Sequence, residues 1–349
     1  MMTNLTDRIA SSAPESPLDK VLPPFCELFD LASSRLGGKT LAASDEFFAS
    51  KENLLSPTLP VFIADKFTEN GKWMDGWETR RRRAPGHDWC IIRLGHPGVI
   101  RGVDLDTSHF LGNYPEHASV EACWVSGDPD AHTVWTEILP VSELRGGSHN
   151  FFAITDAGAW THLRLNIFPD GGVARFRAYG EVRPDPKVFH SRTPIDLGAV
   201  ENGGLALLAN DMFFSHKNNL LMPGRAANMG DGWETKRKRG PGHDWVIVRL
   251  GAPGVLTRIE VDTNHFKGNY PESFSLEGCV AKDAPTSFLT SRSLHWEEIL
   301  PRTKLQGHTQ HVFEREILAK KAFTHVRLNI FPDGGISRLR LHGIPEGAK

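Results

Sequence analysis

The sequence has few cysteines and none of the spacings that would give them a joint role. Its 349 residues include only Cys26, Cys90, Cys123 and Cys279, and no two of them form a CxxC pair. Cys123 and Cys279 both fall in strand-like runs. This scatter favours free, buried thiols in a reducing compartment.

Long apolar runs and an excess of charge of one sign are also missing. No window approaches the roughly 18 apolar residues that a membrane-spanning helix needs. Residues 1–20 lack the apolar core of a signal peptide,. The formal net charge of -2 creates no field toward nucleic acid or a membrane surface,. We therefore expect a soluble, cytoplasmic protein with neither nucleic acid nor a membrane as partner.

Three common catalytic signatures do not occur either. The sequence contains no P-loop, no GxGxxG motif and no GxSxG motif. Nucleotide-binding and α/β-hydrolase chemistry therefore receive no support.

The strongest positive feature is an internal repeat. Residues 75–123 match residues 231–279 without a gap, and about 31 of the 49 paired positions are identical, far more than chance allows. Three further pairs of segments match: WTEILP at Trp135 and WEEILP at Trp296, THLRLNIFPDGG at Thr161 and THVRLNIFPDGG at Thr324, and DEFFASKENLL at Asp45 and DMFFSHKNNLL at Asp211. Each copy is long enough to form a complete domain.

The repeat predicts the domain organisation. We expect an N-terminal extension at residues 1–28, a first domain at residues 29–180 and a second domain at residues 195–349. Residues 181–194 between them are polar, and the stretch 181–193 contains two prolines, which is typical of a linker,.

The secondary structure is expected to be mainly β. Short β-branched or alternating runs lie at 89–94, 99–106, 119–125, 162–168 and 172–180, with equivalents in the second copy,. The glycines and proline at 95–98 are expected to form a turn. The better helix candidates are residues 19–36 and 313–322. The pattern predicts an all-β fold, a tandem duplication of a jelly-roll β-sandwich.

Three polar motifs recur in both copies and supply the candidate site residues, because loops and strand ends carry binding groups on β-sandwiches. In the first copy they are Glu78, Arg80, Arg82, His87 and Asp88; then Asp106, His109 and Asn113; then Arg164, Asn166 and Asp170. The second-copy equivalents are Glu234, His243, Asp244, Asp262, His265, Asn269, Arg327, Asn329 and Asp333.

Structural alternatives exist for most of these groups. Trp77, Trp89, Trp233 and Trp245 are the kind of aromatic residue that fills sandwich cores. Asp170 could form a turn or contact a ligand, and Arg175 and Arg177 alternate as structural residues on a strand do. The basic run at 80–83 indicates a solvated or anion-binding loop rather than a nucleic-acid site. The His and Asp residues could also bind a divalent metal such as Mn²⁺.

The repeated motifs resemble the allantoicase family of ureide catabolism. DGWETRRRR with PGHDW, then DTSHF and GNYP, then THLRLNIFPDGG carry the resemblance, which covers most of the chain. It implies hydrolysis of allantoate to ureidoglycolate and urea in purine degradation. It also implies jelly-roll domains similar to galactose-binding domains, and a homo-oligomer.

Allantoate chemistry suggests roles for these residues. Its central carbon carries a carboxylate and two ureido groups, so the site needs an acid, a base, a carboxylate clamp and partners for ureas. We assign the clamp to Arg80, Arg82 or Arg164, and proton transfer to His87 or His109. Asp88, Asp106 and Glu78 would orient these groups, and Asn113 and Asn166 would bind ureido groups.

Several alternatives stay open at this point. Arg80 and Arg82 become Lys236 and Lys238 in the second copy, and lysine is a poorer bidentate clamp, so the first copy is favoured as the active one,. A site shared between domains or subunits is a further option. The rival functions are a ureidoglycolate-cleaving enzyme that also releases urea, a non-catalytic sugar- or ureide-binding protein, and a regulatory or scaffolding protein.

Overall fold

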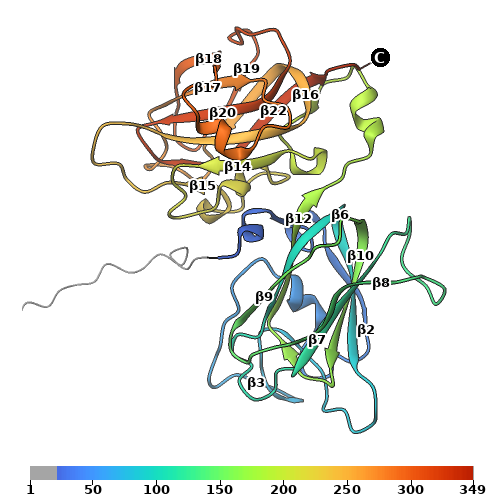
Figure 1. The fold of residues 1–349 in the computed structure, drawn as a ribbon. Helices are drawn as coiled ribbons and strands as arrows, with labels where there is room; N and C mark the ends of the chain where they lie inside the picture. The colour runs from blue at the N-terminus through green and yellow to red at the C-terminus, as the bar shows by residue number, and fades with distance from the viewer. Residues whose placement is uncertain (1–21, 349) are drawn as a thin grey trace, which may run out of the picture.

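The chain folds into two β-domains that repeat one topology. The computed structural model describes residues 22–348 and shows the two domains joined by a short connection (Figure 1). Within these residues the only helical elements are 3-10 turns of three to five residues. The expected all-β tandem jelly-roll fold is confirmed.

The first repeat is built from strands β1 to β12, numbered in chain order. They are β1 (Phe29–Asp30), β2 (Lys39–Ala43), β3 (Phe67–Thr68), β4 (Gly71–Lys72), β5 (Trp77–Glu78), β6 (Asp88–Asp106), β7 (His117–Cys123), β8 (Thr136–Glu143), β9 (His149–Ala153), β10 (Ala159–Phe168), β11 (Gly172–Val173) and β12 (Arg175–Val182). The 3-10 turns are η1 (Pro24–Glu27), η2 (Ser34–Leu36) and η3 (Lys51–Leu55).

The second repeat has matching elements after a connection that contains η4 (Pro186–His190). They are β13 (Ile195–Asp196), β14 (Leu205–Ala209), β15 (Trp233–Glu234), β16 (Asp244–Asp262), β17 (Ser273–Cys279), β18 (Glu297–Lys304), β19 (Gln310–Phe313), β20 (Phe323–Phe331), β21 (Gly335–Ile336) and β22 (Arg338–Pro345). The turns are η5 (Val200–Asn202), η6 (Lys217–Leu221), η7 (Met229–Asp231) and η8 (Thr286–Thr290).

The long strand β6 connects the two layers of the first sandwich. Its first half pairs with β2 and β10, and its second half pairs with β9 and β12. Outward from β6, one layer continues through β10 to β7 and β8, and the other ends with β1 beside β12. Strand β16 does the same in the second repeat.

The expected turn at residues 95–98 is wrong, because β6 runs through it without a break. The two glycines allow other segments to approach this strand closely. A Cβ on Gly95 would lie 2.3 Å from the Leu36 carbonyl oxygen, and one on Gly98 would lie 2.5 Å from that of Glu181. Glycine here therefore permits close packing of the backbone rather than chain reversal.

Both helix predictions are also wrong within the described residues. Residues 22–36 form η1, β1 and η2, and residues 313–322 leave the end of β19 as irregular chain. Residues 19–21 lie outside the described part. Segments this short need tertiary packing to be helical, and Ile317 and Ala319 instead bury their side chains from irregular chain.

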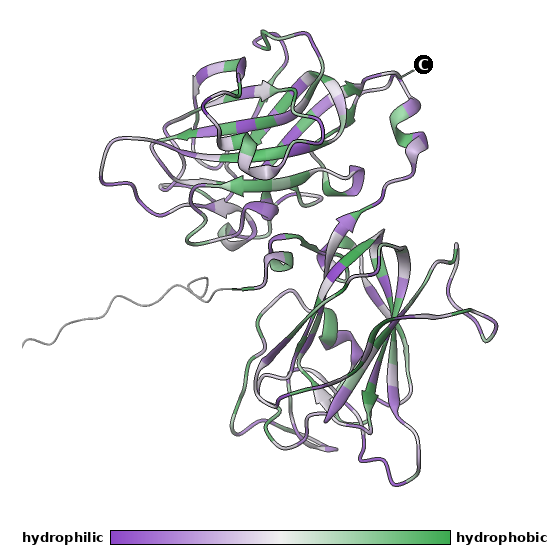
Figure 2. Cartoon of the chain, in the orientation of Figure 1, coloured by the Kyte–Doolittle hydropathy of each residue, from purple (hydrophilic) through white to green (hydrophobic). Residues whose placement is uncertain are grey.

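The core lies between the layers of each sandwich, where the alternating pattern of hydropathy along the strands places the apolar side chains (Figure 2). Trp77 and Trp233 are fully buried, whereas Trp89 and Trp245 are half-buried. All four cysteines are free, and all but the half-buried Cys26 are buried. Arg175 has the structural role that its alternation predicted, since it is buried and pairs with Asp75 at 2.8 Å.

The two repeats contact each other through η1 and η6. The Lys217 ammonium, buried in η6, pairs with the Glu27 carboxylate, and the Asn218 side chain donates to the Glu27 carbonyl oxygen at 2.9 Å. Figure 1 shows η1 between the two domains. Between residues 22 and 348, no helix has the length and apolar character that crossing a membrane requires.

Candidate functional site

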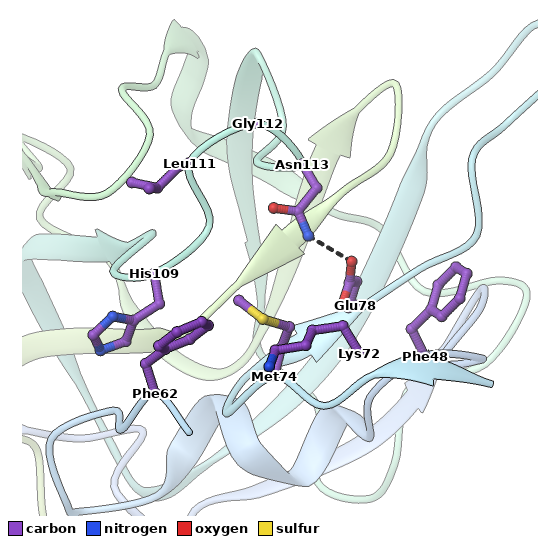
Figure 3. Close-up of a pocket in the computed structure, with 9 residues that line it drawn as sticks. All are labelled: Phe48, Phe62, Lys72, Met74, Glu78, His109, Leu111, Gly112 and Asn113. Atoms are coloured by element: carbon purple, nitrogen blue, oxygen red, sulfur yellow. Dashed lines mark hydrogen bonds between the residues drawn. The ribbon is translucent and has the colours of Figure 1, made fainter. Parts of the chain in front are cut away.

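A short strand and a loop of the first repeat meet at a cleft. Glu78 is the last residue of β5, and Asn113 lies in the loop between β6 and β7. The Asn113 side-chain amide donates a hydrogen bond to Glu78 Oε1 at 2.6 Å, as Figure 3 shows. This bond joins two of the three repeated motifs.

The third motif, Asp170 with two glycines, holds the loop in place. Gly171 has a φ of 139°, and a Cβ there would lie 2.7 Å from both the Asn113 carbonyl oxygen and the Pro115 nitrogen. The Gly172 amide donates to the same Asn113 oxygen at 2.7 Å. Only glycine permits this approach, so the glycines position Asn113 opposite Glu78.

Burial raises the pKa of the Glu78 carboxyl above its ordinary value, and the hydrogen bond from Asn113 opposes that rise. Desolvation favours the neutral form of a carboxylic acid. A carboxyl group that keeps its proton to higher pH, in a cleft, is suited to general acid–base catalysis.

Two cavities adjoin at the Glu78–Asn113 pair. The larger, of about 440 Å³, is mostly apolar, and its lining comprises Phe48, Phe62, Lys72, Met74, Glu78, His109, Leu111, Gly112 and Asn113 (Figure 3). The smaller, of about 260 Å³, is more polar and is lined by Phe48, Glu78, Thr79, Arg81, Gly112, Asn113, Tyr114, Glu116, Pro169, Asp170 and Gly171. The shared residues place the carboxyl group of Glu78 between an apolar and a polar compartment.

His109 borders the larger cavity from an unusual backbone conformation. Its φ is 71°, in the left-handed region that few residues other than glycine occupy,. The ring stacks on Phe62 with centroids 5.8 Å apart, and Nε2 lies 3.2 Å from the Pro60 carbonyl oxygen. Strain of this kind gathers at functional sites, although His265 has the same φ in the second copy.

The apolar wall of this cavity is specific to the first copy. Between the matched DEFF and WET motifs, the first repeat is ten residues longer than the second. The additional segment includes β3 and β4 and brings Phe62, Lys72 and Met74 to the cavity. This difference distinguishes the environment of Glu78 from that of Glu234.

Asp88 and Asp106 are buried at the two ends of β6 and accept hydrogen bonds from residues of the neighbouring loops. Asp88 is only 2% exposed, and its Oδ1 accepts hydrogen bonds from Ser44 and from Arg82 Nη1, both at 2.9 Å. Asp106 is 1% exposed and accepts from the Ser108 amide at 2.8 Å. Asp170 accepts from the Arg82 amide at 2.7 Å, so it both turns the chain and fixes the basic run.

His87, Arg164 and Asn166 gather in a second cluster, and none of them lines the two cavities just described. Arg164 and Asn166 both donate to Glu121 Oε2, at 2.7 and 2.8 Å. Arg164 also lies over the Trp135 ring, and the His87 ring packs on Phe168 with centroids 4.7 Å apart. The structure thus separates the predicted site residues into two groups.

All three arginines selected as carboxylate clamps already have carboxylate partners. Arg80 pairs with Asp45, Arg82 with Asp88 and Arg164 with Glu121. Arg81, which sequence reasoning did not select, is exposed and lines the polar cavity. A signal was present: Arg81 is unchanged as Arg237 in the second copy, whereas both of its neighbours become lysine.

The second repeat reproduces much of this arrangement. Asn269 donates to Glu234 Oε1, and burial raises the pKa of Glu234 as well. The Lys238 amide donates to Asp333 at 2.7 Å, while Asp244 and Asp262 are buried. His243, Arg327 and Asn329 form the second cluster with Glu277. His265 Nε2 lies 2.8 Å from the Ala226 carbonyl oxygen.

The histidines and carboxylates do not come together as ligands of one ion. Across residues 22–348, no group of three or more His, Cys, Asp and Glu side chains is arranged to hold a metal ion. His87 packs on Phe168 and Asp88 binds Arg82, so these two neighbours in sequence face different partners.

Comparison with known proteins places both repeats in one family. The family model described as the allantoicase repeat matches residues 29–183 and 195–346. A protein of Pseudomonas aeruginosa (strain UCBPP-PA14) named probable allantoicase is 53% identical over 324 residues, which is 93% of this chain and 98% of that protein. Probable allantoicase 1 of Burkholderia mallei (strain ATCC 23344) is 50% identical over 327 residues, 93% of this chain and 97% of its own.

A solved structure agrees with the sequence comparisons. The crystal structure of allantoicase from Saccharomyces cerevisiae superposes with a TM-score of 0.76 and 38% sequence identity, covering 90% of this chain and 92% of that one. The similarity therefore extends over both repeats and their arrangement.

Proposed function

Given that this chain belongs to the allantoicase family, we propose that the cleft of its first repeat is where allantoate is hydrolysed to ureidoglycolate and urea. Its relatives match over nearly their whole lengths, so the chain is a hydrolase of allantoate that acts in purine degradation. The observation that carries the placement is the Glu78–Asn113 pair, with Arg81 and His109 lining the adjoining cavities.

The reaction exchanges one ureido group of the central carbon for a hydroxyl group. The departing nitrogen needs a proton, because the urea anion is a poor leaving group. As the C–N bond breaks, the lone pair of the remaining ureido nitrogen forms a C=N bond to the carbon. Water then adds to that carbon and gives up a proton. The site must donate one proton and accept another.

Glu78 is suited to both proton transfers. With its pKa raised by burial, the carboxylic acid holds a proton that it can give to the leaving nitrogen,. The carboxylate that remains can then take a proton from the attacking water. Asn113 orients Glu78 through the 2.6 Å hydrogen bond, and the rest of its exposed amide is free to contact a ureido group.

Arg81 and His109 complete the site from opposite compartments. Arg81 lines the polar cavity, and its guanidinium can grip the substrate carboxylate with two parallel hydrogen bonds,. His109 lines the apolar cavity and can assist proton transfer at the second ureido group,. Phe62 and Met74 give that compartment an apolar wall, and polar interactions beside an apolar wall are stronger than in open water,.

The test measures urea and ureidoglycolate released from allantoate by the full chain, with and without EDTA and added Mn²⁺. Glu78→Gln should lower kcat by about 10²- to 10⁴-fold, the usual contribution of a general acid or base. His109→Asn should lower turnover, whereas His87→Asn should leave it within about twofold if the second cluster is structural. The reverse ranking would move the active site to the second cluster.

The same assay discriminates the rival functions. Glyoxylate and urea from ureidoglycolate, with no product from allantoate, would identify a ureidoglycolate-cleaving enzyme. Ligand binding without any urea would leave a ureide-binding protein.

Two broader expectations remain part of this proposal. The free thiols, three of them buried, support a location in a reducing compartment such as the cytoplasm,. The exposed apolar side chains around the first cleft, which include Leu59, Phe62 and Leu111, support association into a homo-oligomer,.

A further inference from the structure

The second repeat contains a cleft that matches the polar cavity of the first residue for residue. This cleft has a volume of about 700 Å³. All eleven residues that line the polar cavity of the first repeat have an identical counterpart in it: Phe214, Glu234, Thr235, Arg237, Gly268, Asn269, Tyr270, Glu272, Pro332, Asp333 and Gly334.

The identity of the two cleft linings is higher than the identity of the two copies as a whole. In the matching segments of residues 75–123 and 231–279, about 18 of 49 positions differ,. Some of these changes lie directly beside the cleft, such as Leu111 to Lys267. The lining has therefore been kept while its surroundings changed.

The lining of the second cleft includes a carboxyl group whose burial destabilises the folded state when the group is ionised. Burial raises the pKa of the Glu234 carboxyl, so the folded state disfavours its ionised form,. The arrangement still keeps the Asn269 hydrogen bond and leaves Arg237 exposed at the cleft. A half-buried acid beside an exposed basic rim is typical of a ligand site rather than of a structural core.

The rim of the second cleft is more basic than that of the first. Lys304, which lines the second cleft, replaces Glu143 of the first copy and so reverses the charge at that position. Lys304 has 88% of its side chain exposed, at 4.0 Å from Glu272, so most of its charge faces solvent. This replacement favours a ligand with negative charge.

The second cleft differs from the first in the apolar wall and in the histidine that we assign to catalysis. The second copy lacks the ten additional residues that supply the apolar wall. His265 is not among the residues that line the second cleft, and its Nε2 lies 2.8 Å from the Ala226 carbonyl oxygen. The second cleft therefore keeps the binding groups without the apolar wall.

We propose that the second cleft is a separate binding site for small carboxylates that carry a ureido group, the class to which the substrate and product belong. Arg237 and Lys304 hold the carboxylate, and the Glu234–Asn269 pair contacts the ureido group. This inference rests on the proposed function, because it takes the role of Arg237 from that of Arg81.

The test counts ligand sites on the full-length protein with hydantoate, which bears one carboxylate and one ureido group on the same carbon. That carbon has no second nitrogen to expel a leaving group, so the probe is expected not to react. Titration calorimetry should find two hydantoate molecules per chain in the wild type and one in Arg237→Ala. Arg239→Ala removes the same charge two residues away, outside the cleft lining, and should keep two.

Lys304→Glu restores the residue of the first copy at an exposed position, so it tests the rim without endangering the fold. It should weaken one of the two sites by about threefold to tenfold and leave the other unchanged. The proposal is overturned if Arg237→Ala removes no hydantoate site from the number that the wild type binds. A single wild-type site that Arg237→Ala removes would support the second cleft and count against the first. Turnover of allantoate by Arg81→Ala tests the first cleft independently, so the two proposals can fail separately.

Discussion

Asn113 donates its side-chain amide to Glu78 at 2.6 Å, and the backbone oxygen of the same residue accepts from the Gly172 amide at 2.7 Å. One loop residue thus connects the half-buried carboxyl group to the glycine turn behind it. Because the glycine turn, the loop and β5 belong to three separate motifs, this relationship explains why those motifs recur together in both copies.

Asn113→Ala is expected to move the pH dependence of turnover. The hydrogen bond from Asn113 lowers the pKa of Glu78, so its removal raises that pKa further above the ordinary value,. The limb of the pH–kcat/KM profile that belongs to Glu78 should therefore shift to higher pH. Glu78→Gln should abolish that limb. A limb that stays in place in Asn113→Ala would show that another group titrates.

Arg81→Ala is expected to raise KM for allantoate roughly tenfold, since a charge-assisted pair at an exposed position is worth about 1–2 kcal/mol. Arg83→Ala is the matched control, because Arg83 is exposed in the same run and lines neither cavity. Steady-state kinetics with allantoate measure both variants. Equal effects would mean that the run acts only through its summed charge, as a solvated loop would.

Phe62→Ala is expected to lower kcat/KM by about twofold to tenfold, because the ring that stacks on His109 would be lost and an aromatic pair is worth about 0.5–1.5 kcal/mol,. Phe62 is 52% exposed, so its truncation should cost little stability,. Phe67, 67% exposed on β3 and outside the cavity lining, provides the control as Phe67→Ala. A similar loss in both variants would point to general disturbance of the segment.

The duplicated fold could be predicted because its signals are local. Alternating strands and the repeat itself were visible in the sequence, and so was the structural role of Arg175. The path of β6 was not predictable, because Gly95 and Gly98 have the composition of a turn. Their actual role is to admit the Leu36 and Glu181 backbones, which come from distant parts of the chain.

The candidate site was predicted in part for a similar reason. The alternation of strand residues predicts that Arg164 and Asn166 share one face of β10, as their common partner Glu121 shows,. Alternation does not reveal whether that face borders the loop of Asn113. The choice among arginines 80 to 83 also depended on tertiary partners, since Asp45 and Asp88 occupy two of them.

Glu27→Gln is expected to destabilise the contact between the repeats. It removes the carboxylate that pairs with Lys217, whose side chain is only 2% exposed, so a buried ammonium would lose its partner,. Because Glu27 itself is half-exposed, solvent screens part of this effect, and about 1–2 kcal/mol is a reasonable loss,. Glu52→Gln, which alters an exposed pair with Lys51, should change stability by less than about 0.5 kcal/mol,.

The difference in stability between wild type and Glu27→Gln should depend on pH, and the pKa of Glu27 gives the direction. A hydrogen bond from His216 and the pairing with Lys217 lower the pKa of Glu27 from 4.5 to about 2, despite its burial. A carboxyl with a lowered folded-state pKa contributes stability above its unfolded value, and that contribution is lost as pH falls through the folded value. The gap in melting temperature between wild type and Glu27→Gln should therefore be full at pH 7 and shrink between pH 4.5 and about 2,. Burial lowers the pKa of His216 and Glu27 opposes that shift, so both proteins are compared in a His216→Asn background, in which only Glu27 changes its charge. A gap that stays constant across this range would show that the carboxylate charge does not stabilise the contact.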